Sequence, residues 1–157
     1  MTTPTTTQLC TFRLDALLFG VDVVWVREVL RWRPVTRVPL APPEVEGLMN
    51  LRGQIVPAVD VRRRLGMPPR AGDALPLNVV VQVDADPVSL LVDEVGDVLE
   101  VEAAAFERPP ETVVGAARAL IRGAYKLPGR LLLDLDVEKI ARPVSRDLVQ
   151  VTEEVRP

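Results

Sequence analysis

Carboxylates are the side chains of this chain that could do chemistry, because its 157 residues include no histidine. The usual general base near neutral pH and the most common metal ligand are therefore missing. Serine occurs only at Ser89 and Ser145, and neither lies in a nucleophile-elbow context. No P-loop and no GxGxxG motif is present. Any enzymatic chemistry would have to come from a pair of carboxylates.

The acidic residues lie mostly at expected strand ends and turns: Asp60, Asp84, Asp86, Asp93, Glu94, Asp97, Asp134 and Asp136. In an enzyme, Asp84 and Asp93 would be the pair to test. A structural role explains the same pattern, because Asp favours turns and helix N-caps, where it binds nearby backbone N–H groups. Asp60 and Asp136 each precede a short helical segment, as an N-cap would. The sequence therefore favours a non-enzymatic protein.

The composition limits the remaining function classes. A net charge of −3 and an aromatic content of 4% argue against nucleic acid, which needs a basic face or stacking rings. The single cysteine, Cys10, excludes an internal disulfide, and no cysteine cluster suggests a metal, so we expect no cofactor. No signal-peptide pattern and no apolar run near the ~18 residues of a membrane span occurs. We expect a cytoplasmic protein without direct membrane insertion.

Short strands must position these residues. Residues 1–8 are Thr-rich and predict a disordered tail. A change of apolar period predicts a short helix at Val24–Trp32. The other elements predicted in the first half are strands at Leu9–Arg13, Leu17–Val23, Val35–Pro39, Leu48–Leu51 and Gln54–Val59, and a helical turn at Val61–Leu65.

The segment Gly66–Pro76 is the best internal boundary, because the apolar pattern restarts after it. The second half predicts strands at Leu77–Val83, Val88–Val92, Asp93–Val101, Leu120–Leu127 and Arg130–Leu135, with a short helical end at Val137–Ala141. The ordered domain is expected to span residues 9–142, divided into subdomains of about 9–70 and 73–142. Residues 143–157 are expected to form a C-terminal tail in which the segment after the domain packs back or frays.

The two halves repeat each other in order and spacing. Gly47, Leu51, Gly53, Asp60 and Val61 recur as Gly123, Leu127, Gly129, Asp136 and Val137, and Val23, Val26, Val29 and Leu30 recur as Val92, Val95, Val98 and Leu99. The pattern predicts a duplicated β unit, although abundant Val and Leu leave chance as an alternative. About five short strands in each half predict a mainly β fold of two small barrels with a few short helices. Barrels this small should share a hydrophobic interface.

Four segments resemble the chemotaxis coupling-protein (CheW) family. They are FRLDALLFGVDVVWVREVL at Phe12–Leu30, GLMNLRGQIVPAVDVRRRLG at Gly47–Gly66, VSLLVDEVGDVLEV at Val88–Val101, and LIRGAYKLPGRLLLDLDVEKI at Leu120–Ile140. The resemblance implies two SH3-like five-stranded β-barrels around a shared core. It also implies a non-catalytic adaptor that links cytoplasmic tips of chemoreceptors (methyl-accepting chemotaxis proteins) to the regulatory domain of the chemotaxis histidine kinase.

The resemblance also implies site residues. The receptor-binding set would be Val26, Gly47, Asn50, Arg52, Gly53 and Val80, and the kinase-binding set would be Glu28, Val29 and Val35. Two alternatives remain open at this point. Val26 could be plain core, and Arg52 could form an internal ion pair, perhaps with Glu28, a role compatible with receptor coupling. Arg62–Arg64 has two interpretations, a solvated helix face or a surface for an acidic partner.

The sequence departs from the family pattern at two places, and it leaves three other functions to consider. Trp25 and Trp32 accompany Arg31 and Arg33 near the kinase-facing segment, and Glu46 precedes Gly47, which suggests altered partner specificity. A coupling protein of a non-chemotaxis chemosensory array has the same sequence features. An enzyme with a carboxylate pair and a nucleic-acid-binding small barrel are less consistent with them.

Overall fold

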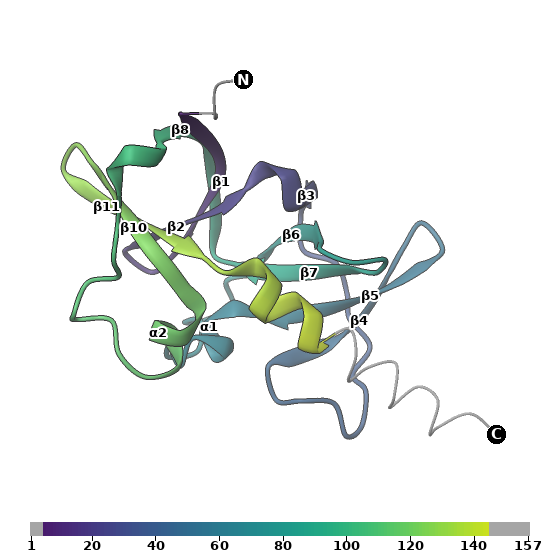
Figure 1. Cartoon of the computed structure of the whole chain (residues 1–157). Helices are drawn as coiled ribbons and strands as arrows, with labels where there is room; N and C mark the ends of the chain where they lie inside the picture. Colours follow the sequence, from purple (N-terminus) through teal and green to yellow (C-terminus); the bar gives the residue numbers. More distant parts are fainter. Residues whose placement is uncertain (1–4, 145–157) are drawn as a thin grey trace.

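The computed structural model describes residues 5–144, and it is mainly β (Figure 1). The predicted tails therefore lie partly outside the described residues, at 1–4 and 145–157. Eleven strands occur in the described range: β1 (Thr6–Leu14), β2 (Leu17–Asp22), β3 (Val26–Leu30), β4 (Val45–Leu51), β5 (Gln54–Asp60), β6 (Leu77–Gln82), β7 (Pro87–Val92), β8 (Glu94–Glu102), β9 (Phe106–Glu107), β10 (Ile121–Leu127) and β11 (Arg130–Leu135).

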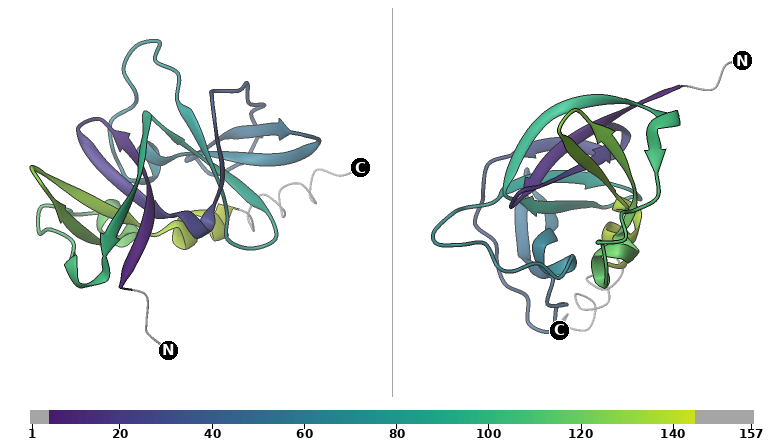
Figure 2. Two further views of the ribbon diagram at one scale, coloured as in Figure 1. Left: turned by 90° about the horizontal axis from the view of Figure 1, so that it is seen from above. Right: turned by 90° about the vertical axis from the view of Figure 1, so that its left-hand side faces the viewer.

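The short helical elements lie between and after the strands. They are the 3-10 turns η1 (Val23–Trp25) and η2 (Ala103–Ala105), the helices α1 (Val61–Arg64) and α2 (Ala116–Leu120), and a helix over residues 137–144. Figure 2 (right) shows the α-helices gathered together on one side of the strands.

The strands form one six-stranded and one five-stranded sheet. The six-stranded sheet has the order β8-β1-β2-β11-β10-β9, and the five-stranded sheet has the order β3-β6-β7-β5-β4. Neighbouring strands are antiparallel except at β11–β2 and β5–β7, which are parallel. The prediction of a mainly β fold in two β units with few short helices is confirmed, but β9 adds a sixth strand to one of them.

The sheets do not divide the chain at residues 70–73, as the predicted subdomains would. β1 and β2 join the strands of the second half, and β6 and β7 join the strands of the first half. Each half thus contributes its first hairpin to the sheet that contains the later strands of the other half. Local apolar patterning specifies a hairpin but not the strand edge on which it pairs, so the sequence alone could not show this exchange.

The two sheets have the same internal order, which supports the duplicated unit. The order β3-β6-β7-β5-β4 in one sheet corresponds strand by strand to β8-β1-β2-β11-β10 in the other. The parallel pair, β7–β5 in one and β2–β11 in the other, occupies the same place in both orders. The repeated glycines explain one shared constraint. A Cβ on Gly47 would lie 2.5 Å from the Thr36 carbonyl oxygen, and one on Gly123 would lie 2.4 Å from that of Glu107. Both glycines leave room for the backbone of a segment that crosses their strand.

Three local predictions are corrected by the structure. The predicted helix at Val24–Trp32 is the turn η1 followed by β3, because β-branched valines pair with β6 instead of continuing a helical face. The predicted strand Val35–Pro39 makes a single bridge, Thr36 to Leu48, since Pro34 and Pro39 limit ladder hydrogen bonds. Strand β1 begins at Thr6, inside the predicted tail, and pairs there with Glu102.

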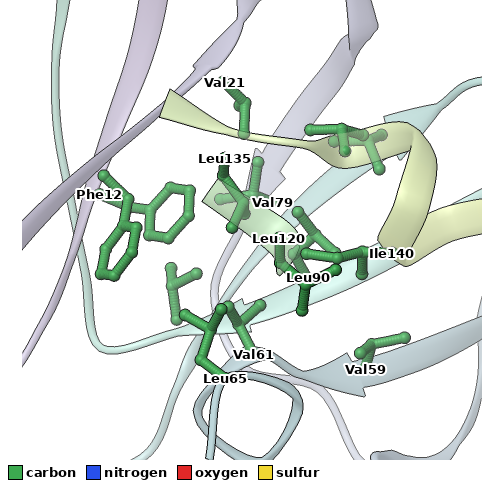
Figure 3. Close-up of a cluster of buried hydrophobic side chains, with 14 of the residues drawn as sticks. Phe12, Val21, Val59, Val61, Leu65, Val79, Leu90, Leu120, Leu135 and Ile140 are labelled. Atoms are coloured by element: carbon green, nitrogen blue, oxygen red, sulfur yellow. The ribbon is translucent and has the colours of Figure 1, made fainter. Parts of the chain in front are cut away.

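One apolar cluster joins the two sheets. Phe12 and Val21 from the six-stranded sheet meet Val79 and Leu90 from the five-stranded sheet, with Ile140 of the 137–144 helix beside them (Figure 3). Two smaller buried clusters each draw their residues from one sheet only. Leu9, Leu18, Val101, Tyr125 and Leu132 lie on the six-stranded sheet, and Met49, Leu51, Val56 and Val80 lie on the five-stranded sheet. The predicted shared core is therefore present.

Candidate functional site

Strand β3 is an exposed edge of the five-stranded sheet. It pairs with β6 on one side only, with Glu28 opposite Val80 and Val29 opposite Val79. Val29 is 44% exposed, whereas Val26 is half-buried and packs against the main core. An edge strand presents unpaired backbone groups to another chain. The geometry makes β3 a natural docking edge, with Val29 as its apolar contact.

The β4–β5 hairpin places Arg52 and Gly53 at an exposed tip. Both residues have positive φ, 52° and 83°, as a type I′ turn requires. The Asn50 side-chain oxygen accepts a hydrogen bond from the Gly53 N–H at 2.8 Å. Nothing lies within 4 Å of a Cβ built on Gly53, so the glycine is needed for its backbone conformation. Asn50 and Gly53 thus hold the turn that displays Arg52.

Arg52 and Glu28 form a bidentate ion pair between the hairpin and β3. Arg52 Nη1 and Nη2 donate to the two Glu28 carboxylate oxygens at 2.7 and 2.6 Å. The hydrogen bond from Arg52 is the main cause that lowers the pKa of Glu28. The Arg52 side chain is 68% exposed, so the pair contributes little to stability. The internal ion pair considered from the sequence exists, and it leaves the guanidinium accessible to a partner.

Val80, Val35 and Gly47 lie beneath this surface. Val80 is 1% exposed and forms the floor of a depression of about 190 Å³ bordered by Arg27, Glu28 and Arg52. Val35 is half-buried and packs on the apolar cluster that contains Met49 and Val56. Gly47 is buried where Thr36 crosses β4. These three residues shape the site from below, whereas Val29, Asn50, Arg52 and Gly53 face outward.

A basic segment spans β3 and the residues that follow it. Arg27, Arg31, Arg33 and Arg37 are all exposed, and within residues 5–144 none of them forms an ion pair. Trp32 lies among them and is 39% exposed. An exposed aromatic ring flanked by arginines is typical of an interface anchor. This surface is basic in a chain whose net charge is −3, which favours a partner with acidic groups.

Arg62 corrects the interpretation of Arg62–Arg64 as a solvated or partner-facing run. Arg62 is 4% exposed, whereas the side chain of Arg63 is 48% exposed. The Arg62 guanidinium binds Asp93 through Nε at 2.9 Å and again through Nη2, and it binds Asp15 at 2.5 Å and the Pro68 carbonyl at 2.9 Å. Arg70 Nε donates to Asp93 at 2.9 Å. Arg62 therefore ties α1 to the β1–β2 turn and to the start of β8.

Asp84 and Asp93, the carboxylates considered for catalysis, each form ion pairs with arginines. Burial acts to raise the pKa of Asp93, but hydrogen bonds from Arg62, the Asp15 N–H and Arg70 outweigh it and lower that pKa to about 2. Asp84 lies elsewhere and pairs with Arg142 at 3.2 Å. Asp60 and Asp136 are N-caps as predicted, accepting from the Arg62 and Lys139 N–H groups at 3.1 and 3.2 Å. Each of these four carboxylates therefore has a structural partner, either an ion pair or a capping hydrogen bond.

Sequence reasoning missed two buried charged residues, Arg62 and Asp134. Asp134 interrupts the apolar strand β11 and is 7% exposed, and burial is the main cause that raises its pKa to about 6. A single charge inside the run Leu131–Leu135 was the available signal, since the repeat places Ala58 at the equivalent position. For Arg62 the signal was weaker, because three consecutive arginines do not reveal which one faces inward.

Comparison with known proteins agrees with this geometry. The model of the CheW-like domain family matches residues 8–144. The chain is 34% identical to the chemotaxis protein CheW of Rhizobium meliloti over 140 residues, covering 89% of this chain and 90% of the relative. It is 29% identical to the chemotaxis protein CheW of Bacillus subtilis over 134 residues, with 85% of each chain covered.

A solved structure has the same fold. The scaffolding protein TtCheW from Thermoanaerobacter tengcongensis matches with a TM-score of 0.74 and 28% identity, covering 82% of this chain and 88% of the other. Within residues 5–144, no helix is both long enough and apolar enough to cross a membrane.

Proposed function

We propose that this chain, which belongs to the CheW-like domain family, joins the regulatory domain of a chemotaxis histidine kinase to the cytoplasmic tips of chemoreceptors. Its class is that of the family, a chemotaxis coupling scaffold without catalytic activity. The observation that carries the proposal is the contact between two surfaces, where the Arg52 hairpin is ion-paired to the exposed edge strand β3.

The kinase-binding surface in this proposal is β3 with the residues that support it. Val29 offers an exposed apolar contact on an unpaired strand edge, and Glu28 offers a carboxylate whose side chain is 23% exposed. Val35 acts indirectly, because it is half-buried and packs on the apolar cluster that contains Met49 and Val56. Strand edges give affinity through backbone hydrogen bonds and specificity through alternate side chains, which suits a β-rich regulatory domain.

The receptor-binding surface in this proposal is the β4–β5 hairpin and the depression beside it. Arg52 is the direct contact, since its planar guanidinium can hold a carboxylate or backbone carbonyls of a receptor helix. Asn50 and Gly53 fix the turn that carries Arg52. Gly47, Val26 and Val80 maintain the strands beneath it, and the burial of Gly47 and Val80 supports an indirect role.

Binding of purified kinase regulatory domain and of a receptor tip fragment tests the two surfaces separately. We expect Glu28→Ala to weaken kinase binding about tenfold, as for an interface residue whose truncation costs more than about 1 kcal/mol. We expect Arg52→Ala to weaken receptor binding mainly. Arg130→Ala, an exposed arginine beside the turn of the other hairpin, is the matched control and should change neither.

The outcome that would overturn the proposal is a folded wild-type protein that binds neither partner. Equal losses for both partners in Glu28→Ala and Arg52→Ala, together with loss of folded signal, would instead assign the Arg52–Glu28 pair a structural role. Circular dichroism of each variant separates these outcomes, because an exposed pair should leave the fold intact.

A further inference from the structure

A small polar pocket lies on the six-stranded sheet, separate from the Arg52 hairpin. Its volume is about 110 Å³, and it forms where β1, β10 and β11 meet the segment Asp22–Trp25 and the start of the 137–144 helix. The proposed coupling function uses none of its polar groups. The pocket is large enough to hold more than one water molecule, and therefore the head group of a small ligand.

Asp134 faces this pocket without a partner. Strand alternation places its side chain on the same face as Leu132, toward the apolar cluster that contains Leu9 and Tyr125. Asp134 is 7% exposed, and within the described part of the chain it makes no hydrogen bond and no ion pair within 4 Å. A buried carboxylate without a partner costs stability. The fold does not require it, since the repeat has Ala58 at the equivalent place.

The pocket has an excess of negative charge. Asp22, Asp136 and Glu138 also line it, and among residues 5–144 Arg122 is the only cationic side chain in its lining. Asp22 and Asp136 each accept one backbone N–H as caps, from Val24 at 3.0 Å and Lys139 at 3.2 Å. Glu138 pairs with Arg142 at 2.7 Å. These carboxylates are thus partly satisfied, and Asp134 is the one left for a ligand.

The lining favours an organic cation over a metal ion. No group of three acidic, histidine or cysteine side chains among residues 5–144 is arranged to hold a metal. Instead, Trp25 and Tyr125 line the pocket next to the carboxylates. Aromatic faces combined with a carboxylate suit ammonium and guanidinium groups. We propose that this pocket binds one ammonium or guanidinium group, with Asp134 as its counter-ion.

The chain contains two tryptophans, which provide an internal control for the test. Trp25 lines the pocket, whereas Trp32 lies in the basic segment after β3. Full-length ¹⁵N-labelled protein is titrated with n-propylammonium and with ethylguanidinium chloride at constant ionic strength. We expect a saturable shift of the Trp25 indole N–H signal and none for Trp32. Asp134→Asn should weaken the binding at least about tenfold, the loss expected for a charge-assisted contact.

Asp73→Asn is the matched control, because Asp73 is exposed in the loop before β6, and it should bind like wild type. Lowering the pH through about 6 should weaken the binding, as burial raises the pKa of Asp134 to about that value. The neighbouring groups that also act on this titration are Asp22, Asp136 and Arg122.

Three results would overturn the proposal: no Trp25 shift with either cation, an undiminished shift in Asp134→Asn, or a shift produced only by MgCl₂. The inference does not depend on the coupling function. N-acetyl-lysine-N-methylamide identifies the source of the cation. Tighter binding than propylammonium would indicate a lysine side chain of a partner, and equal or weaker binding would indicate a free amine.

Discussion

Arg62 illustrates how a long charged side chain can belong to the interior. Its guanidinium satisfies Asp93, Asp15 and a backbone carbonyl, so its burial is matched by hydrogen bonds. Arg70 is less well satisfied, because its Nη2 is buried and lacks a hydrogen-bond partner within residues 5–144. Charged side chains in this protein therefore form hydrogen bonds in the interior as well as at the surface.

Removing Arg62 should destabilise the fold strongly. Arg62→Ala leaves Asp93 buried against fewer donors, and we expect a loss of about 3–5 kcal/mol in the free energy of unfolding. Arg63→Ala, its exposed neighbour, should cost less than about 1 kcal/mol. Urea denaturation of both variants checks the contrast. Similar losses would mean that the Arg62 ion pairs do not stabilise the protein.

Asp134 should give the protein an unusual dependence of stability on pH. Its pKa is raised to about 6 in the folded state, so its stabilising effect is fully present below the unfolded value near 4 and is lost as the pH rises through about 6. Asp93 acts in the opposite sense, because its pKa is lowered to about 2 and its contribution is lost as the pH falls toward that value.

Asp134→Asn should therefore be more stable than wild type at pH 7, by about 1 kcal/mol, since water in the pocket reduces the full effect of the shift. The gain should vanish at pH 4. Thermal denaturation across pH 4–8 measures the difference, with Asp73→Asn as the control that should parallel wild type. A constant difference at all pH values would contradict this titration.

Strand β3 and its surroundings show what happens at the scale of elements. The valines at Val23, Val26 and Val29 have helical spacing, yet the segment forms a turn and an edge strand because β6 offers a ladder. By contrast, the β4–β5 hairpin was predictable, since an Arg-Gly pair between two apolar runs indicates a two-residue turn. Elements with their own turn chemistry were predicted well, and elements that depend on a distant partner strand were not.

Gly47→Ala should damage the crossing at β4. The added Cβ would lie 2.5 Å from the Thr36 carbonyl oxygen, so we expect a loss of about 1–3 kcal/mol. Hydrogen exchange should quicken at the Leu48 N–H, which donates to that oxygen at 2.8 Å. Gly53→Ala is a useful comparison, because its strain of about 1 kcal/mol is confined to the turn. Unchanged exchange at Leu48 in Gly47→Ala would count against the close approach.

The exchange of hairpins governs the molecule as a whole. Because each sheet contains strands from both halves of the sequence, neither sheet can form from a continuous half of the chain. The main apolar cluster also spans both sheets and the helix of residues 137–144. We therefore expect the two sheets to unfold together rather than as separate subdomains.

Ile140→Ala tests this cooperativity. Ile140 is fully buried between the sheets, and its truncation should cost about 2–5 kcal/mol. Far-UV circular dichroism and tryptophan fluorescence should report one coincident transition, shifted equally. Amide protection should fall in both sheets by the same free energy. Two separated transitions in either protein would show that the sheets are independent.

The sequence by itself determined the mainly β class, the repeated unit, the Arg52 hairpin and the Asp60 and Asp136 caps, because each depends on residues close together in the chain. The tertiary structure decided which hairpin joins which sheet, that Val24–Trp32 is not a helix, and that Val80 and Arg62 are buried. It also brought Asp134 to the pocket at Trp25. These features depend on pairing between distant segments, and local propensity does not specify the partner.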